Sequence, residues 1–402
     1  MSMHDVRILY LGRGLRGFGD GSATIILPAY LTAIGYGPIA IGIVVTASLL
    51  GTAVFTLAVG VIAPRHDLRT LMLAGALLMA FTGLAFPNIQ HVAFLALVAF
   101  VGTINPSTGD LGLLIPIEHA MLARGVSDQE RTHAFARYSL IGALSMAGGT
   151  LAAAAPDILT RAGVEQPVAF KLMFYAYAAL GLVCVALYRQ LPHARMTDRG
   201  KQAPLGPSRG LVYKLAALFS LDAFSGGFVV QSLLALWLFE RFDLSISSAG
   251  AFFFCAGTLS AFSYPVAARL ARRIGLINTM VFTHIPSSIF LILAALSSNL
   301  YLALGLLLLR SALSQMDVPT RTSYVMAVVT PAERATAASV TAVPRSLASS
   351  VSPIFAGALL TTALPGLPLI VCGIGKIVYD LALLYSFRRI KPPEEIRPTI
   401  SK

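Results

Sequence analysis

Long apolar segments follow one another along almost the whole chain and are separated by short polar connections. A helix needs about 20 apolar residues to cross the hydrocarbon core of a bilayer, and twelve of these segments are long enough. They lie at about residues 7–35, 39–63, 69–87, 91–122, 131–155, 168–190, 211–239, 247–268, 276–297, 299–329, 333–362 and 367–389. The pattern predicts an all-α membrane protein with twelve transmembrane helices.

One polar connection is much longer than the others. Residues 191–210 read LPHARMTDRGKQAPLGPSRG and are dominated by Pro, Gly and basic residues, which is typical of a linker. We therefore predict an N-terminal six-helix half over residues 1–190, a cytoplasmic linker over 191–210 and a C-terminal six-helix half over 211–402.

The two halves repeat each other. The segment IPIEHAMLARGVSDQERTHA, which begins at Ile115, aligns with VPTRTSYVMAVVTPAERATA, which begins at Val318. Pro116 then coincides with Pro319, and an acid–base pair in the following loop coincides as well. The matches are sparse, but they fall where a six-plus-six arrangement predicts them. The halves are therefore expected to be pseudo-symmetric.

Composition excludes a soluble protein. Of the 402 residues, 56% are hydrophobic and only 12% are charged, whereas soluble domains have about 25% charged residues. The formal net charge of +12 would suit a nucleic-acid partner, but most of the 30 Lys and Arg residues lie in predicted cytoplasmic loops and tails. This asymmetry follows the positive-inside rule. It indicates cytoplasmic termini and no nucleic-acid partner.

Sequence motifs for other chemistry are missing. The three cysteines lie within apolar spans, without the spacing of a metal site or a disulfide framework. No Walker A pattern appears, so ATP is not indicated as the energy source. An enzyme acting on lipid-linked substrates would need catalytic groups in sizeable loops, and the loops here are short and poor in paired acids or histidines. We expect no enzyme, no cofactor and no metal.

The predicted span at 299–329 carries charges in its middle. Arg310, Ser314, Asp317 and Arg321 are spaced i, i+4, i+7 and i+11, which places them on one face of a helix. An ionisable residue near the bilayer centre costs roughly 2.5–3.5 kcal/mol on insertion scales. These side chains should therefore face a protein interior or a water-filled path, and such a path in a membrane protein usually carries a solute.

Twelve spans, a basic central linker and a parallel repeat resemble the major facilitator superfamily. The superfamily loop after the second span reads G-x-x-x-D-R-x-G-R-R, and here it reads GVIAPRHDLR. Gly60, Arg65 and Arg69 fit this motif. Pro64 replaces its Asp, and Asp67 replaces its second Gly. Three glycines alone represent the proton-antiporter motif of span 5: Gly142, Gly148 and Gly149.

The resemblance implies a bacterial permease of the inner (cytoplasmic) membrane, with no subfamily assigned, that acts as a monomer. It also implies that spans 1, 4, 7 and 10 line a central cavity, and the embedded charges concentrate in those spans. With one addition from span 11, the candidates for binding substrate or coupling protons are Arg16, Asp20, Asp110, Glu118, Asp222, Arg310, Asp317, Arg321 and Arg345.

Matching places in the two halves carry opposite charges, since Arg16 aligns with Asp222 and Glu118 with Arg321. One interpretation is an ion pair between the halves that breaks on one side of the cavity during transport. The alternative is a permanent salt bridge within one half, because a desolvated charge needs a partner in either case. Arg310 with Asp317 is an example of such a pair.

Carboxylates among the candidates can carry coupling protons, and the arginines can bind an anionic substrate through planar bidentate contacts. The proton cycle is expected to run through Asp222 or Glu118, with Asp20 or Asp110 next in line.

Three further polar residues in the apolar spans are interpreted as structural. Lys376 and Asp380 are one helical turn apart in the last span and can pair on their own helix. His284, beside a proline in the ninth span, is interpreted as a buried histidine whose hydrogen bonds are satisfied.

The function that fits best is secondary active transport. We expect a small organic solute to cross the membrane by alternating access, coupled to protons, with efflux as a candidate direction. Uptake or exchange of an organic anion remains an alternative, as does an uncoupled facilitator or lipid flippase. The expected partners are thus the solute, protons and the lipid bilayer.

Overall fold

The computed structural model describes residues 3–107, 112, 114–126, 131–195, 204–330, 333–388 and 390. Within these ranges the chain forms sixteen α-helices and two short 3-10 helices, and no strand. The predicted all-α membrane fold is confirmed. Eight helical stretches in the described ranges are long and apolar enough to cross a membrane.

The helices fall at the twelve predicted segments, three of which contain two helices each, except for one short helix at residues 155–161 that lies in a predicted connection. The first eight are α1 (Met3–Ala33), α2 (Pro38–Ile62), α3 (Leu68–Ala85), α4 (Val92–Val101), α5 (Ile115–Gly125), α6 (Arg131–Ala152), α7 (Ala155–Arg161) and α8 (Gln166–Tyr188). The others are α9 (Arg209–Gly227), α10 (Gln231–Phe242), α11 (Ile246–Ile274), α12 (Leu276–Leu296), α13 (Leu300–Ser314), α14 (Asp317–Val328), α15 (Arg334–Leu360) and α16 (Leu367–Phe387). The 3-10 helices are Ala63–Arg65 and Phe86–Asn88.

The span predicted at 299–329 is interrupted, so the expectation of one continuous charged face is wrong. Helix α13 ends at Ser314 and α14 begins at Asp317. Pro319 explains the break, because a proline lacks the N–H of an internal helical bond and its ring clashes with the carbonyl four residues earlier, here that of Gln315. Pro116 is the second residue of α5, close to the start of that helix.

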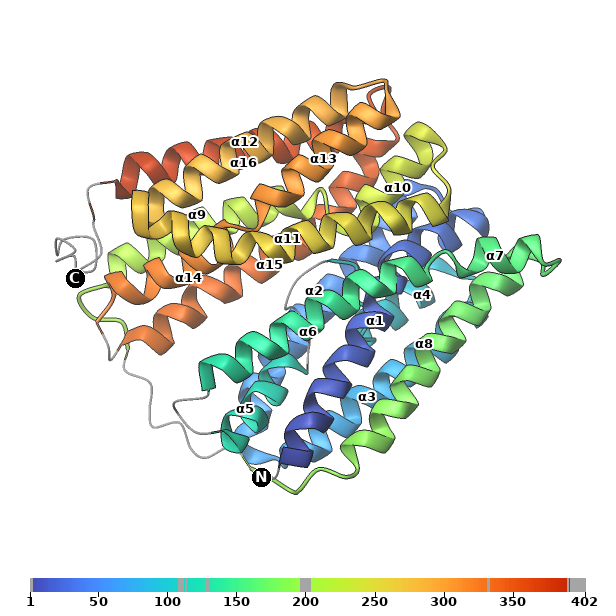
Figure 1. Cartoon of the computed structure of the whole chain (residues 1–402), viewed down its shortest axis with the longest axis horizontal. Helices are drawn as coiled ribbons and strands as arrows, with labels where there is room; N and C mark the ends of the chain where they lie inside the picture. Colours follow the sequence, from blue (N-terminus) through green and yellow to red (C-terminus); the bar gives the residue numbers. More distant parts are fainter. Residues whose placement is uncertain are drawn as a thin grey trace. The chain divides into compact units, whose positions relative to one another are not determined.

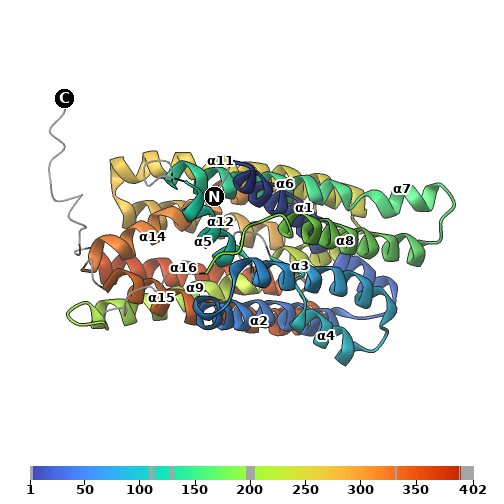
Figure 2. The same cartoon turned by 90° about the horizontal axis from the view of Figure 1, so that it is seen from below.

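The chain folds into two compact units. Unit 1 comprises residues 1–198, 229–258 and 353–365, and unit 2 comprises 199–228, 259–352 and 366–402. In unit 1, α1 packs against α6 and α8, α3 packs against α8, and α2 packs against α4 (Figure 1, Figure 2). Tyr30, Phe86 and Phe174 form an aromatic group among these helices, with neighbouring ring centroids 5.1 Å apart.

Unit 1 contains segments from both halves of the sequence. The Gln231 amide at the start of α10 donates to Thr24 Oγ1 of α1 over 3.0 Å. Ser232 donates to the carbonyl of Pro106 from both its backbone N–H and its hydroxyl, each over 3.2 Å. Thr150 of α6 likewise donates to the carbonyl of Gly250 in α11 over 3.1 Å. Polar contacts therefore join the spans of residues 1–190 to α10 and to the beginning of α11.

In unit 2, α12 packs against α16, α13 and α14, and α16 packs against α9 (Figure 1). The core of this group includes Phe219, Met280, Tyr324, Tyr379 and Phe387, all almost fully buried. These core residues come from α9, α12, α14 and α16, which thus surround a common interior, and the charged side chains described below lie within it.

At each end of the linker, the residues that the structure describes donate hydrogen bonds to a carboxylate of a neighbouring segment. In unit 1 the backbone N–H of Ala194 donates to Asp67 over 2.7 Å. Burial raises the pKa of Asp67, but hydrogen bonds from Ala194, His193 and Thr70 outweigh it and leave the pKa below its ordinary value. The stability that such a contact contributes is present at neutral pH and is lost only as the pH falls towards the lowered pKa.

In unit 2 the backbone N–H of Gly206 and the hydroxyl of Ser208 both donate to Glu333, the latter over 2.8 Å. Hydrogen bonds from Thr330 and Ser208 lower the pKa of Glu333 to about 2. This carboxylate therefore stays ionised at neutral and mildly acidic pH.

Glycines bring α1 and α6 into backbone contact. A Cβ on Gly21 would lie 2.0 Å from the carbonyl oxygen of Met146, and one on Gly149 would lie 2.0 Å from that of Phe18. Small residues allow such close approach between membrane helices. The glycine-rich start of the chain is therefore explained by packing, and Gly149, one of the three glycines in the span 5 motif, belongs to the same contact.

We predict that Gly149→Ala destabilises the protein by about 1–3 kcal/mol, because the added methyl group overpacks the α1–α6 contact. Gly148→Ala is the matched control on the same helix, since a Cβ at Gly148 meets no atom within 4 Å. Thermal unfolding of the purified proteins in detergent measures the difference. Equal midpoints for the two variants would contradict the packing explanation.

Candidate functional site

A cluster of four side chains lies in the interior of unit 1. Arg16 of α1 forms an ion pair with Glu118 of α5 through Nη2 and Oε2. The Nε of Arg16 also donates to the hydroxyl of Tyr188 over 3.2 Å. Glu118 in turn accepts from Tyr138 of α6 and, over 2.5 Å, from Tyr188 of α8. We call Arg16, Glu118, Tyr138 and Tyr188 the Arg16 cluster.

The Arg16 cluster is buried, and each of its charges has polar partners. The Glu118 side chain is 0% exposed and that of Arg16 is 9% exposed. Buried charges are tolerated when geometry is good and further hydrogen bonds satisfy the remaining donors and acceptors. The two tyrosines supply such bonds here, so the cluster ties α1, α5, α6 and α8 together.

A second cluster lies in the interior of unit 2. Asp222 of α9 contacts Lys376 of α16 through Oδ1 and Nζ, 2.7 Å apart, and Arg321 of α14 through Oδ2 and Nη1, 3.2 Å apart. Arg321 also pairs with Asp317 one helical turn away, at 2.9 Å. The guanidinium of Arg321 lies over the ring of Phe219, 5.6 Å from its centroid, in a cation–π geometry.

This cluster extends to α12. The Nε2 of His284 lies 3.2 Å from Lys376 Nζ, and its Nδ1 lies 3.1 Å from Asp380 Oδ1. Asp222, His284, Asp317, Arg321, Lys376 and Asp380 are called the Asp222 cluster. The interpretation that Lys376 pairs with Asp380 on its own helix is therefore wrong, because His284 takes up a position between the two. The prediction that His284 is a buried histidine with satisfied hydrogen bonds is confirmed, because both of its ring nitrogens have partners, and these partners belong to the charged cluster.

Each of the aligned residues of opposite charge has a partner within its own unit. Arg16 pairs with Glu118 in unit 1, and Asp222 pairs with Arg321 in unit 2. The interpretation of an Arg16–Asp222 or Glu118–Arg321 pair that breaks and forms during transport stays a prediction. The alternative of a salt bridge within one half describes the structure, although with partners other than Arg310 and Asp317.

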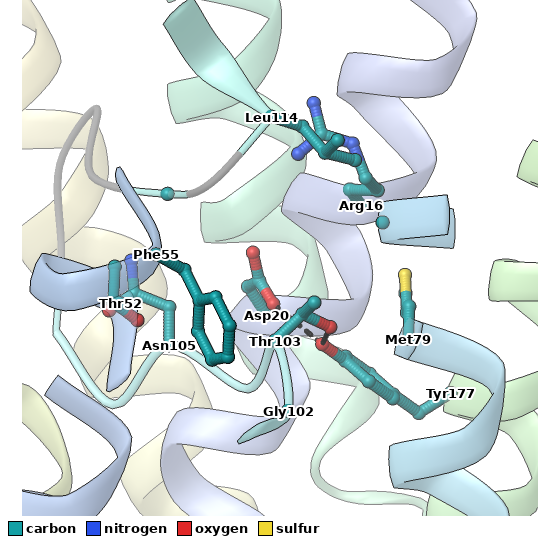
Figure 3. Close-up of a pocket in the computed structure, with 12 residues that line it drawn as sticks. Arg16, Asp20, Thr52, Phe55, Met79, Gly102, Thr103, Asn105, Leu114 and Tyr177 are labelled. Atoms are coloured by element: carbon teal, nitrogen blue, oxygen red, sulfur yellow. Dashed lines mark hydrogen bonds between the residues drawn. The ribbon is translucent and has the colours of Figure 1, made fainter. Parts of the chain in front are cut away.

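Asp20 lies one turn after Arg16 on α1 and lines a cavity in unit 1 (Figure 3). The hydroxyl of Tyr177 donates to Asp20 over 3.1 Å and lies 3.2 Å from the hydroxyl of Thr103. Figure 3 shows Tyr177 meeting Asp20 and Thr103, with Arg16 on the adjoining turn. Phe55 and Asn105 also line the cavity.

The walls of the cavity combine polar and apolar groups. Ligand pockets typically combine an apolar lining with a few placed polar groups. Asp20, Thr52, Asn105 and Tyr177 provide polar groups here, and Phe55 and Met79 provide apolar surface.

Two predicted arginines form no ion pair with the described residues. Among these residues no carboxylate lies within 4.0 Å of Arg310 of α13 or Arg345 of α15. The Nε of Arg345 is buried and has no hydrogen-bond partner in the same described ranges. Asp110, the remaining predicted residue, lies outside the described residues.

No group of three or more His, Cys, Asp or Glu side chains in the described part of the chain could hold a metal ion. The arrangement as a whole offers binding and proton exchange. It provides a cavity with one carboxylate, and two buried networks that connect several helices.

The sequence profile of the Major Facilitator Superfamily matches residues 9–353 and 215–402 of the chain. The uncharacterized membrane protein YJR124C of Saccharomyces cerevisiae is 25% identical over 421 residues, which cover 95% of this chain and 94% of the yeast protein. Solved structures are similar in fold. The D-xylose-proton symporter has a TM-score of 0.76 at 14% identity, with 98% of each chain covered. Nucleoside transporter NupG has a TM-score of 0.72 at 13% identity, with 95% of this chain and 99% of that chain covered.

The Arg16 cluster generates a stability prediction. Glu118→Met leaves the Arg16 guanidinium buried without its anion, which costs about 3–5 kcal/mol when one partner of a buried pair is removed. The double variant Arg16→Met with Glu118→Met should be less destabilised than the sum of the two single variants. Thermal unfolding in detergent measures this coupling, with Arg137→Met, an exposed position on α6, as the control. Additive effects would mean that the two charges do not interact.

Proposed function

Because the chain belongs to the Major Facilitator Superfamily, as a multi-pass membrane transporter and not an enzyme, we propose that it moves a small organic solute by alternating access and uses a proton gradient. The observation that carries this proposal is the Asp20 carboxylate in the wall of the unit 1 cavity. The proposal includes the cytoplasmic membrane as location, cytoplasmic termini, and halves at residues 1–190 and 211–402 joined by the linker.

The lining of the cavity supports a polar solute with a ring or a short carbon skeleton. Thr52, Asn105 and Tyr177 offer hydrogen-bond donors and acceptors, while Phe55 offers an aromatic face. Such a mixture suits a sugar-like or nucleoside-like molecule better than a lipid chain, because a hydrocarbon could make no hydrogen bond with the polar groups of the wall. Similar folds include a xylose-proton symporter and a nucleoside transporter, which is consistent with this class.

Asp20 is the embedded carboxylate best placed to exchange a proton with the cavity. Glu118, Asp222 and Asp317 each contact a cation directly. Among the described residues no cation lies within 4.0 Å of Asp20, and this carboxylate accepts a hydrogen bond from the neutral hydroxyl of Tyr177. The proton cycle expected at Asp222 or Glu118 is therefore proposed for Asp20 instead.

Alternating access requires some contacts in unit 1 to be temporary. The hydrogen bonds of Gln231 to Thr24 and of Ser232 to Pro106 join α10 to spans of the other half of the sequence. In the proposed cycle these bonds break when the halves rock, and they re-form afterwards. Each is a neutral hydrogen bond with a net stability of about 0.5–1.5 kcal/mol, so breaking a few of them is compatible with transport.

We predict that Asp20→Asn keeps solute exchange and loses accumulation driven by a pH gradient, because an amide keeps the shape and accepts the Tyr177 hydrogen bond but cannot bind a proton. Proteoliposomes with the purified protein are tested with D-xylose, uridine, a dipeptide and an organic anion, with and without the gradient. Asp243→Asn is the matched control, since Asp243 is exposed and its left-handed backbone suits asparagine.

The same assay separates the alternatives. Parent protein that equilibrates a solute without responding to the gradient would be an uncoupled facilitator, and this would refute the coupled mechanism. Accumulation in Asp20→Asn equal to that in the parent would move the coupling proton elsewhere.

Transport of an organic anion is a second candidate function, and the unpaired arginines favour it. A buried guanidinium without an acidic partner is well suited to bidentate contact with a carboxylate or phosphate. Arg345→Gln should then reduce flux of the anionic probe by about tenfold or more, the loss of roughly 1.4 kcal/mol, and leave flux of neutral probes within about twofold. Equal losses for both kinds of probe would indicate a structural role for Arg345.

A further inference from the structure

The Asp222 cluster connects four helices of unit 2 by direct polar contacts. Its order of contacts runs from Asp380 through His284 and Lys376 to Asp222, and from there through Arg321 to Asp317. The side chains of Asp222, His284, Asp317, Arg321 and Asp380 are at most 6% exposed, and that of Lys376 is 13% exposed. The proposed function uses Asp20 in unit 1. It assigns no role to Asp380, the first side chain in this row of contacts.

The hydrogen-bonding capacity of each group fixes the tautomer of His284. A lysine ammonium has three N–H donors and no acceptor, so the Nε2 atom 3.2 Å from it must accept. The proton of the neutral imidazole then lies on Nδ1 and is donated to Asp380 Oδ1 over 3.1 Å. A second proton on Nε2 would place two donors opposite each other, so the histidine can gain one only if Lys376 withdraws.

The contacting groups of the cluster carry an excess negative charge. Three carboxylates, Asp222, Asp317 and Asp380, face two basic side chains, Arg321 and Lys376, while His284 is neutral. Arg345 of α15 adds a third positive charge, which interacts electrostatically with Asp222 and Asp317, and Cys372 of α16 also interacts with Asp222. Among the described residues no Lys or Arg lies within 4.0 Å of Asp380, so the charge of this carboxylate has no direct compensation in a desolvated interior, which favours the uptake of a proton there.

Asp380 offers the place for that proton. Its Oδ2 atom is buried and has no hydrogen-bond partner among the described residues, although its Oδ1 atom accepts from His284. Buried carboxylate oxygens normally accept at least one hydrogen bond. The hydroxyl of Tyr379, the neighbouring residue, is likewise buried and without a partner in the described ranges.

We propose that Asp380 holds one exchangeable proton on Oδ2 and that His284 and Lys376 transmit its presence to Asp222. A hydronium ion donates the proton, an O–H bond forms on Oδ2, and water takes the proton back on release. The carboxylate becomes a neutral acid, and the hydrogen bond from Nδ1 loses its charge assistance, which is worth roughly half its strength. The imidazole is then less polarised, Nε2 is a weaker acceptor, and Lys376 bonds mainly to Asp222.

The proton on Asp380 thus strengthens the contact between α16 and α9. This goes beyond the proposed function, because it adds a proton site in unit 2 that is separate from the cavity and from Asp20. The transport substrate is not needed to test it.

Infrared difference spectroscopy on the full-length protein in lipid bilayers, between neutral and acidic pH and without solute, measures protonation of buried carboxyl groups. We expect a carbonyl band of a protonated acid that shifts with ¹³C-labelled aspartate, is lost in Asp380→Asn and persists in Asp243→Asn. A parent spectrum without such a band, or a band unchanged in Asp380→Asn, would overturn the proposal.

Nitrogen spectra of ring-labelled histidine provide an independent measurement that also holds if Asp380→Asn fails to fold. The His284 signal, assigned by its loss in His284→Gln, should show a protonated Nδ1. His91 is the internal reference with the opposite tautomer, because its Nδ1 accepts from the backbone N–H of Ala93 over 3.3 Å. Lys376→Met should shift the Nε2 resonance of His284, whereas Lys214→Met, at an exposed position on α9, should not. A protonated Nε2 in the parent would overturn the proposal.

These measurements are separate from the test of transport. Parent protein that ignores a pH gradient but shows the Asp380 band refutes coupled transport and supports the proton site. Parent protein that accumulates solute under the gradient but lacks the band refutes the proton site and leaves the proposed function standing.

Discussion

The free energy of burying a charge away from water determines most of what is specific in this protein. Arg16 and Asp222 can lie where they do only because partners come to them from other helices. Each buried charge therefore fixes the relative position of several helices in its unit. The Arg16 cluster does this for α1, α5, α6 and α8, and the Asp222 cluster does it for α9, α12, α14 and α16.

The two clusters are related by an exchange of sign. The arginine of unit 1 lies on the first helix of the sequence and its acid lies on α5, whereas in unit 2 the acid lies on α9 and the arginine on α14. The attraction between two charges depends on their product, so exchanging both signs leaves the pair energy unchanged. The surroundings differ, however. Two tyrosines complete the Arg16 cluster, while a lysine, a histidine and two more acids extend the Asp222 cluster.

The sequence was sufficient to predict the helices, because the apolar segments are long and their connections short. It also identified the embedded charges, since Arg16, Glu118, Asp222 and Arg321 stand out in apolar surroundings. It could not identify their partners, because pairing depends on which helix faces are adjacent. The alignment of the two halves shows which positions are equivalent, but it does not show which side chains are in contact. The break at Gln315 was readable from Pro319, but an unbroken helical period was assumed across it.

The group around His284 shows a different limit. Lys376 and Asp380 have the spacing of a pair on one helix, and that local rule was sufficient to account for both. The structure inserts an imidazole from α12 between them, a contact between residues 96 positions apart for His284 and Asp380. The spacing of two residues on one helix can be read from the sequence alone, whereas a contact with a side chain from a distant helix is known only from the tertiary fold. The presence of Lys376 and Asp380 in one buried region could have suggested a third polar partner such as His284.

The distance along the chain between paired charges has a consequence for biosynthesis. Arg16 and Glu118 are 102 residues apart, and Asp222 and Lys376 are 154 apart. At about 5–20 residues per second, the first charge of each pair emerges from the ribosome roughly 5–30 s before its partner. During that interval α1 and α9 carry unpaired charges and cannot settle in lipid in their final positions. Membrane insertion of this protein is therefore completed only by late synthesis, and the earlier helices must wait beside the translocation machinery or in contact with one another.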